Sequence, residues 1–421
     1  MLFRSFNNYF LLRILVSFAA EKGFNIHQLD VKATYLYADL KEEIYMKAPE
    51  GDPYHGNGFW KLKKALYGLK QAAREWNENI TNTIQDLEFK RLVSEPCIFI
   101  KSINNEIVCI VGIYVDDVLI TGTDYEINNT VNLIKEKYTI TGVGNADLII
   151  GIKIEKINNG YLLQQERYLT DILDKFGLTN CRSSKIPGPI KLINKNSNSF
   201  DATTYRAAVG SLLYLAISTR PDILYATNQA SRHSQIPTLQ DWENVVAIFR
   251  YLKGNPYYGL YFCGNAKLRT FIDADYGGDT RERKSTSGFV CFLSIGPTSW
   301  NTKLQESVAT STAEAEYYSL CECIKQVLWY INIIKELNIN IEPSKIFIDN
   351  KSTIYNAQNE TINPSSKHID IRYHMVCDHT KKKRIELEYI KSEENIADSL
   401  TKFLNCNKTE KFRNSLLYKF K

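Results

Sequence analysis

The most informative hydrophobic pattern runs from Ile107 to Ile120, where apolar residues are interrupted by the adjacent acids Asp116 and Asp117. The flanking residues predict two short strands, and the Asp pair predicts the tight turn of a hairpin between them. Charged side chains rarely lie inside such a run unless they are paired or bind a metal. Asp also favours turns through its own backbone hydrogen bonds, so the pattern alone leaves two interpretations open, turn residues or metal ligands.

The other elements indicate a multidomain α+β and α/β protein. The stretch 9–20 predicts an amphipathic helix, and the Pro-, Asn- and Ser-rich stretch 185–204 predicts a linker. Helices are expected after the linker, and then a mixed α/β segment. The expected helices are 205–217, 223–231 and 242–252, and the expected strands are 271–272, 289–293 and 346–348.

Composition fits a globular chain with two or three domains. The chain has 421 residues, 44% of them hydrophobic and 24% charged, and a formal net charge of +5, which allows a polyanionic partner without requiring one. The nine Cys residues are scattered without paired CxxC motifs, which argues against a zinc site and favours reduced cysteines in a reducing compartment. No apolar run is long enough to span a bilayer, and 9–20 lacks a cleavage site typical of a signal peptide.

Four acids in the second half lie next to predicted strands or on a predicted helix. Asp273 and Asp349 follow short apolar strands, and Asp398 opens a helix. The helix at 310–320 carries Glu314 and Glu316, of which at most one can join a cluster because residues two apart point to different faces. Carboxylates gathered at one sheet edge, without His or Cys, are typical of Mg²⁺ or Mn²⁺ sites. Taken singly, each Asp is better explained by a structural role, with Asp273 or Asp398 as helix caps and Asp349 as a turn at the end of a strand.

Long motifs then resemble the reverse transcriptase of copia-type LTR retrotransposons. The segments that carry this resemblance are QLDVKATYLYADL (28–40), KLKKALYGLKQAAREW (61–76), YVDDVLITG (114–122), VGSLLYLAISTRPDILYA (209–226) and FRYLKGNPYYGLYF (249–262). Further segments resemble the ribonuclease H domain of the same polyproteins: DADYGGD (273–279), RKSTSGFV (283–290), STAEAEYYSL (311–320), SKHIDIRYH (366–374) and ADSLTK (397–402). The chain is similar to the C-terminal portion of such a Pol polyprotein.

The resemblance implies two active sites that each use two Mg²⁺ or Mn²⁺ ions. In the polymerase palm, Asp30, Asp116 and Asp117 would be the catalytic and metal-binding carboxylates. Tyr35 would contact the incoming dNTP and reject a 2′-hydroxyl, although an aromatic on a buried helix face fits the same position. In the ribonuclease H domain, the matching catalytic and metal-binding set is Asp273, Glu316, Asp349 and Asp398.

Other positions in the ribonuclease H motifs have two interpretations. His368 and His374 could be catalytic, or packed and hydrogen-bonded. Arg283, Lys284 and the run 381–384 could contact the backbone of an RNA/DNA hybrid, or form a solvated face.

The implied domains are a palm and thumb start (1–184), a linker and helical connection (185–265), a ribonuclease H-like domain (266–404) and a tail (405–421). The implied partners are RNA template, DNA primer, RNA/DNA hybrid, dNTPs and the rest of a Gag-Pol polyprotein, with no membrane and with dimerisation left open. The expected location is the cytoplasm, within a virus-like particle in intact elements, or the nucleus.

Departures from the family pattern put polymerase activity in doubt. The family's upstream fingers region, with cations for the triphosphate, is expected to be truncated here, which would weaken the nucleotide site. Thr34, Tyr37, Ala38, Ala73 and Tyr276 also differ from the usual residues. Two alternatives therefore stand beside the bifunctional enzyme: a nucleic-acid-binding relic without catalysis, and a protein with ribonuclease H activity only.

Overall fold

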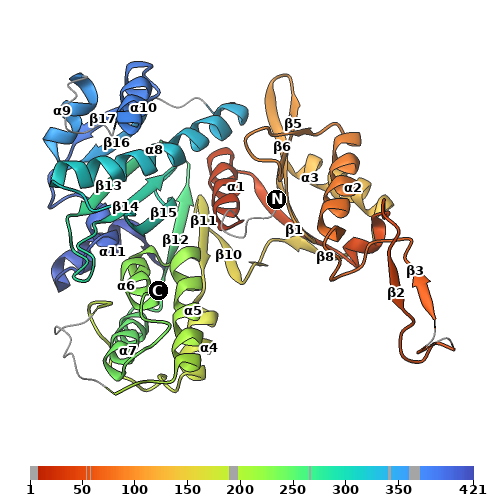
Figure 1. Cartoon of the computed structure of the whole chain (residues 1–421). Helices are drawn as coiled ribbons and strands as arrows, with labels where there is room; N and C mark the ends of the chain where they lie inside the picture. The colour runs from red at the N-terminus through yellow and green to blue at the C-terminus, as the bar shows by residue number, and fades with distance from the viewer. Residues whose placement is uncertain are drawn as a thin grey trace. The chain divides into compact units, whose positions relative to one another are not determined.

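A computed structural model of the protein describes residues 8–53, 55–56, 58–188, 198–264, 267–339, 343–359 and 370–421. Its backbone is a mixture of helices and mostly antiparallel sheets (Figure 1), as the sequence predicts. The chain divides into two compact units. One contains 1–11, 24–147 and 336–338, and the other contains 12–23, 148–335 and 339–421. No described helix is both long and apolar enough to cross a membrane.

The first unit is built on a six-stranded antiparallel sheet of order β4-β5-β6-β7-β1-β8. Its strands are β1 (Asn25–Val31), β4 (Lys90–Arg91), β5 (Ile98–Ile103), β6 (Glu106–Tyr114), β7 (Asp117–Gly122) and β8 (Ile140–Asn145). The remaining elements are the 3-10 helix η1 (Thr34–Tyr37), the hairpin β2 (Tyr45–Lys47) and β3 (Phe59–Lys61), and the helices α2 (Ala72–Asp86) and α3 (Asp124–Lys137). The predicted hairpin is therefore present as β6 and β7.

Two helices cover the core of this sheet because each places an apolar stripe at helical spacing. The stripe of α2 is Trp76, Ile80 and Ile84, and α3 contributes residues 127, 131 and 134. These side chains form one buried cluster with residues of β1, β6 and β7. Thr123 begins α3 by accepting a hydrogen bond from the Glu126 amide. The acidic hairpin formed by β6 and β7 therefore rests on a packed layer.

The second unit contains two five-stranded sheets. One is antiparallel, of order β18-β12-β11-β10-β9, with strands β9 (Leu148–Ile149), β10 (Ile152–Ile157), β11 (Gly160–Gln164), β12 (Tyr258–Cys263) and β18 (Tyr418–Lys419). Its chain segment also supplies α4 (Glu166–Lys175), α5 (Ala202–Ser218), η2 (Pro221–Ile223), α6 (Leu224–Ser231) and α7 (Leu239–Gly254). The three helices predicted after the linker are present as α5, α6 and α7. Part of the predicted linker, 189–197, lies outside the described residues.

The other sheet is mixed, of order β15-β14-β13-β16-β17. Strands β13 (Arg269–Asp275), β14 (Thr286–Phe292) and β15 (Pro297–Leu304) are antiparallel, while β16 (Ser344–Ile348) and β17 (Ile385–Tyr389) run parallel to β13. Its helices are α8 (Thr312–Glu336), α9 (Lys351–Asn359), α10 (Asp370–Lys381), the 3-10 helix η3 (Ile396–Leu400) and α11 (Cys406–Leu416). In Figure 1, α8 lies across this sheet.

The first helix, α1 (Asn8–Lys22), corrects one prediction. The helix itself is confirmed, but it is not amphipathic, because every residue from 10 to 20 is buried. The one charged side chain in that stretch, Arg13, donates to the Ile217 and Ser218 carbonyls at 3.0 and 3.1 Å and lies 3.9 Å from the centre of the Trp300 ring. Capping the end of α5 and stacking on an indole allow this guanidinium to be buried.

Candidate active sites

The first acidic site lies where β1 meets the β6–β7 hairpin. The hairpin turn is two residues long, with Tyr114 paired to Asp117 and Val115 at a φ of 54°. The Val31 amide donates to the Asp116 carbonyl at 3.1 Å, and Asp30 is the register partner of Asp117. Cross-strand partners share one face of a sheet, so this pairing brings Asp30 and Asp117 together from distant parts of the sequence.

Neutral groups hold the two paired carboxylates. The Gln28 amide donates to Asp117 Oδ1 at 3.0 Å, and the Thr141 hydroxyl donates to Asp30 Oδ2 at 2.7 Å. The pKa of Asp117 is raised, mainly because burial disfavours its charged form and also because Asp116 and Asp30 are negative; the Gln28 hydrogen bond opposes the change. A bound cation would relieve this repulsion.

Tyr35 lies in η1, which follows β1, and its ring packs edge-on against Tyr67 with the centroids 4.4 Å apart. Tyr67 is held in turn by its hydroxyl, 3.1 Å from the Thr34 hydroxyl. The pKa of Tyr35 is raised by burial, with smaller effects from Tyr67 and Asp116. Tyr35 therefore lies near the acidic hairpin, packed against Tyr67 and against the edge of the hydrophobic cluster of the first unit.

The second acidic site is assembled on the mixed sheet. β13 and β16 pair in parallel with Phe271 opposite Phe347, and this register, carried two residues further, places Asp273 alongside Asp349. Asp398 lies in the 3-10 helix η3. The side-chain amide of Asn395, at the start of η3, donates to the Ile272 carbonyl of β13 at 2.8 Å. This hydrogen bond holds η3 against the strand that carries Asp273.

A glycine permits the close approach of η3 to the sheet. A Cβ at Gly288 on β14 would lie 2.7 Å from Thr401 Cγ2 and 2.9 Å from Leu400 Cβ. The Thr302 hydroxyl of β15 donates to the Leu400 carbonyl at 2.7 Å. Any larger residue at Gly288 would therefore push η3, and Asp398 with it, away from the other acids.

Carboxylate oxygens of Asp273, Asp349 and Asp398 all lie within 4.8 Å of one another, which is close enough to share a metal ion. Asp273 is 2% exposed and Asp398 is 1% exposed. Asp273 accepts a hydrogen bond from the Thr401 hydroxyl. The Lys402 ammonium lies 3.4 Å from Asp273 Oδ2 and 3.1 Å from Asp398 Oδ1.

The structure separates the roles of the two glutamates on α8. Glu316 Oε1 accepts a hydrogen bond from the Ala274 amide at 3.2 Å, while its buried Oε2 has no hydrogen-bond partner. Glu314 instead accepts hydrogen bonds from the amide and hydroxyl of Thr310, at 2.6 and 2.5 Å, and belongs to the start of the helix. Of the two, Glu316 is the one beside Asp273.

Burial, and after it the repulsion between neighbouring carboxylates, disfavours the ionised acids of this cluster. Burial raises the pKa of Glu316 well above its usual range, and Asp273 and Asp349 raise it further. Burial, followed by the charge of Asp273, raises the pKa of Asp398 to about 6. The pKa of Asp273 is also raised, mainly by burial, although Lys402 and Thr401 oppose the change. Burial disfavours the charged form of Lys402, but the negative charges of Asp273 and Asp398 outweigh this effect and raise the pKa of Lys402.

Two buried carboxylate oxygens of this cluster, Glu316 Oε2 and Asp398 Oδ1, have no hydrogen-bond partner, and hard oxygen donors of this kind fit Mg²⁺ or Mn²⁺. Within the part of the chain that the structure describes, only Asp273, Asp349 and Asp398 form a group of three or more acidic, His or Cys side chains with atoms this close together. The hairpin acids converge on one region but are spaced more widely.

The positions around both sites also include residues that sequence reasoning missed. Gln28, Thr141, Thr401 and Lys402 contact the predicted acids. The signal for the last two was spacing, because residues three and four positions after Asp398 fall on its side of a helical turn. The other two depend on sheet register, which the sequence does not specify.

The remaining sequence candidates are less informative. His368 lies outside the described residues, whereas His374 is exposed on α10. Arg283 and the run 381–384 are exposed, and Lys284 is partly buried beside Glu282. Their role as contacts to nucleic acid stays a prediction.

Comparison with known proteins gives these sites a context. The family model described as reverse transcriptase (RNA-dependent DNA polymerase) matches residues 3–190, the segment that contains the acidic hairpin. The chain is 35% identical over 414 residues to the retrovirus-related Pol polyprotein from transposon TNT 1-94 of Nicotiana tabacum, covering 95% of this chain and 31% of the relative. It is 32% identical over 414 residues to the corresponding polyprotein from transposon RE1 of Arabidopsis thaliana, covering 96% of this chain and 28% of the relative.

An uncharacterized mitochondrial protein of Arabidopsis thaliana is 35% identical over 222 residues, which are 52% of this chain and 92% of that protein. The fold and the family match together define a protein with a reverse transcriptase domain. More particularly, the chain belongs to the Pol polyprotein family of copia-type transposons, and the resemblance inferred from its motifs is confirmed. It spans about three tenths of the length of the curated polyproteins named above.

Proposed function

We propose that the chain is an RNA-directed DNA polymerase and an RNA/DNA-hybrid ribonuclease, each activity served by one of the two acidic sites. The observation that carries the polymerase half is the register that pairs Asp30 with Asp117 beside Asp116. These three carboxylates would hold two Mg²⁺ or Mn²⁺ ions. Such ions lower the pKa of an attacking hydroxyl and stabilise the leaving oxygen in phosphoryl transfer.

The residues of this chain would position the polymerase reactants. The Gln28 and Thr141 hydrogen bonds fix the rotamers of Asp117 and Asp30, so both carboxylates are oriented before a substrate binds. Tyr35, backed by Tyr67, would lie against the sugar of the incoming dNTP and exclude a 2′-hydroxyl by steric contact. The proposed partners are RNA template, DNA primer and dNTPs.

The ribonuclease half is carried by the unpartnered, buried Oε2 of Glu316, together with the proximity of Asp273, Asp349 and Asp398. A carboxylate oxygen buried without a donor is costly, and a metal ion is the partner that a cluster of four acids would attract. The proposed set is Asp273, Glu316, Asp349 and Asp398, holding two Mg²⁺ or Mn²⁺ ions. The proposed substrate is the RNA strand of an RNA/DNA hybrid.

The proposed organisation follows from this assignment. The palm and thumb start would occupy 1–184, the connection 185–265, the ribonuclease H-like domain 266–404 and the tail 405–421. In this proposal the chain works beside the rest of a Gag-Pol polyprotein, in the cytoplasm or in a virus-like particle.

Primer extension tests the polymerase half. Incorporation of labelled dTTP on a poly(A) template with an oligo(dT) primer is measured in Mg²⁺ and in Mn²⁺ for the wild type and for Asp116→Asn. We expect the substitution to abolish incorporation. Asp86→Asn removes an exposed acid of α2 in the same unit and serves as the matched control. Undiminished incorporation by Asp116→Asn would contradict the assignment of the hairpin acids.

Hybrid cleavage tests the ribonuclease half through a pair of variants on one helix. Glu316→Gln should abolish cleavage of the labelled RNA strand, whereas Glu314→Gln, two residues away, should retain it because an amide oxygen can still accept from Thr310. Asp349→Asn should behave like Glu316→Gln. Salt-sensitive hybrid binding without cleavage in the wild type would instead favour a binding protein without catalysis.

A further inference from the structure

Lys402 is placed in the second acidic site by a backbone that cannot easily move. Its amide donates to the Asp398 carbonyl at 3.2 Å, and the preceding Thr401 hydroxyl donates to Asp273. The following residue, Phe403, packs edge-on against Tyr225 with the ring centroids 4.9 Å apart. These contacts on both sides fix the point from which the lysine side chain starts.

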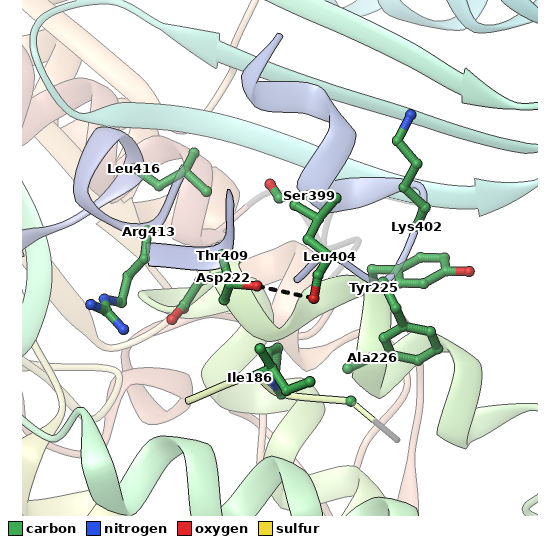
Figure 2. A pocket seen from close by; sticks show the side chains of 13 residues that line it. Ile186, Asp222, Tyr225, Ala226, Ser399, Lys402, Leu404, Thr409, Arg413 and Leu416 are labelled. Atoms are coloured by element: carbon green, nitrogen blue, oxygen red, sulfur yellow. Dashed lines mark hydrogen bonds between the residues drawn. The ribbon is translucent and has the colours of Figure 1, made fainter. Parts of the chain in front are cut away.

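Figure 2 shows Lys402 extending away from the small cavity lined by Tyr225, Leu404 and Leu416. The cavity volume is about 30 Å³, which holds one or two water molecules. The ammonium group does not lie in this cavity. The ammonium group instead lies 3.4 Å from Asp273 Oδ2 and 3.1 Å from Asp398 Oδ1.

The two acids and the lysine differ in their freedom to move. The side chains of Asp273 and Asp398 are 3% and 2% exposed, whereas that of Lys402 is 39% exposed. The carboxylates are therefore fixed in the interior, while the lysine can rotate its ammonium group into water on its flexible stem. If one member of the group leaves, it is Lys402.

The charge balance of the site favours movement of the Lys402 ammonium group away from the acids when metal binds. Four carboxylates carry four negative charges when ionised, and two divalent ions neutralise all of them. An ammonium group within 3.5 Å of the same oxygens would then repel the ions at short range in a site with little water. The oxygens that face Lys402 belong to two of the three acids able to share a metal ion.

We propose that Lys402 is a tethered cation that holds Asp273 and Asp398 together in the metal-free protein and is displaced from them by an incoming divalent ion. Lys402 is a positioning residue, not a catalytic one. This inference rests on the proposed ribonuclease site, because it assumes that the four acids bind metal. Its consequence is that Lys402 lowers the affinity of the site for metal while protecting the metal-free fold.

Calorimetric titration with MnCl₂ tests the competition directly. The full chain carries Asp116→Asn and Asp117→Asn in all samples, so that the hairpin does not contribute to binding. In this background Lys402→Met is expected to lower the Kd for Mn²⁺ about tenfold or more, since a competing cation is removed. Lys402→Arg, which keeps the charge, should resemble the parent. Lys411→Met is the matched control, because Lys411 on α11 donates to the Glu393 carbonyl and not to the acids.

Thermal unfolding provides the second measurement. In EDTA, Lys402→Met should unfold at a lower temperature than the parent, because Asp273 and Asp398 lose their nearest cation, and only Lys408, 3.9 Å from Asp398 Oδ2, remains. Added Mn²⁺ should then raise its unfolding temperature by more than it raises that of the parent. If the variant folds only with metal, the protein is prepared in Mn²⁺ and its unfolding after EDTA addition is compared with that of Lys411→Met, which should stay folded.

The outcomes separate this inference from the function on which it rests. Equal or weaker Mn²⁺ binding by Lys402→Met overturns the role of Lys402, even if Asp349→Asn abolishes binding and so supports the metal site. Binding that is unaffected by Asp349→Asn, or no binding in any variant, overturns the proposed ribonuclease site and the competition together. Tighter binding in Lys402→Met that is lost on adding Asp349→Asn supports both.

Discussion

Replacing Asp398 with Asn should stabilise the metal-free protein relative to the wild type, and the gain in the free energy of unfolding should be larger at neutral pH than at acidic pH. In the folded chain the pKa of Asp398 is raised from 3.8 to about 6, chiefly by burial and then by Asp273. Between these two values the folded state binds more protons than the unfolded state. Stability therefore falls as pH rises through this window, and the penalty is complete above the folded pKa. An Asn side chain does not ionise, so the variant lacks this dependence.

The size of the effect follows from the shift. A difference of about 2 pKa units corresponds to about 3 kcal/mol at 1.36 kcal/mol per unit. This value already includes the opposing ion pair with Lys402 at 3.1 Å. The side chain is 2% exposed, so water screens it little. Comparing the variant with the wild type at several pH values isolates this term, because any packing change due to the amide is the same at each pH.

Urea unfolding in EDTA from pH 4 to pH 8 measures the difference. With a urea m value of about 3 kcal/mol/M, the midpoint of the variant should gain about 1 M on the wild type across this range. Asp378→Asn provides the control, since Asp378 is exposed and paired with Lys382 on the surface of α10. Parallel midpoint curves for Asp398→Asn and the wild type would refute the reasoning that burial and the charge of Asp273 raise the pKa of Asp398 in the folded chain.

Three further substitutions test the packing that supports the sites. Arg220→Met should lower the free energy of unfolding by roughly 3–5 kcal/mol in urea titrations, because it leaves Asp222, which the buried guanidinium contacts at 3.0 and 2.8 Å, as an unpaired buried charge. Adding Asp222→Leu should recover most of this loss. A double variant that is as destabilised as Arg220→Met alone would refute this account. Val115→Gly should raise the free energy of unfolding by about 1 kcal/mol, because a β-branched residue is strained at a φ of 54°, and a destabilised variant would show that the Val side chain matters more. Gly151→Ala should lower the unfolding temperature, since the φ of Gly151 is 72° and the new Cβ would clash with the Tyr214 hydroxyl. An unchanged unfolding temperature would mean that the loop relaxes freely.

Local pattern was enough to predict the acidic hairpin but not its partners. The alternation from Ile107 to Ile120 specifies two strands and a turn, and the structure has them as β6 and β7. Gln28 and Thr141 could not be predicted, because their contacts depend on β1 lying between β7 and β8, with a register shift between Gln28 and Asp30. Strand order and bulges are set by packing of the whole sheet, and no short stretch of sequence specifies them.

The N-terminal helix shows a different limit. Its apolar run with one Arg has the composition of a helix with a polar face, and the helix was predicted correctly. Its burial on all sides was not, because Arg13 finds the carbonyls of Ile217 and Ser218 more than two hundred positions later in the chain. A charged residue in a helix indicates an exposed face only when the folded protein has no buried hydrogen-bond acceptor that can pair with it. Such acceptors are tertiary information.

The two acidic sites solve the same electrostatic problem in different ways. At the hairpin, Asp30 and Asp117 are half-buried and are held by a hydroxyl and an amide, both neutral donors. Neutral donors orient carboxylates without cancelling their charge, so the site keeps its attraction for cations at all times. In the mixed sheet Asp273, Glu316 and Asp398 are buried and Asp349 is partly buried, so neutral donors alone would leave the charges of the buried acids uncompensated. A lysine side chain then becomes part of the site, and because it comes from the turn that follows Asp398, the same short segment supplies both a metal ligand and the cation that competes with the metal.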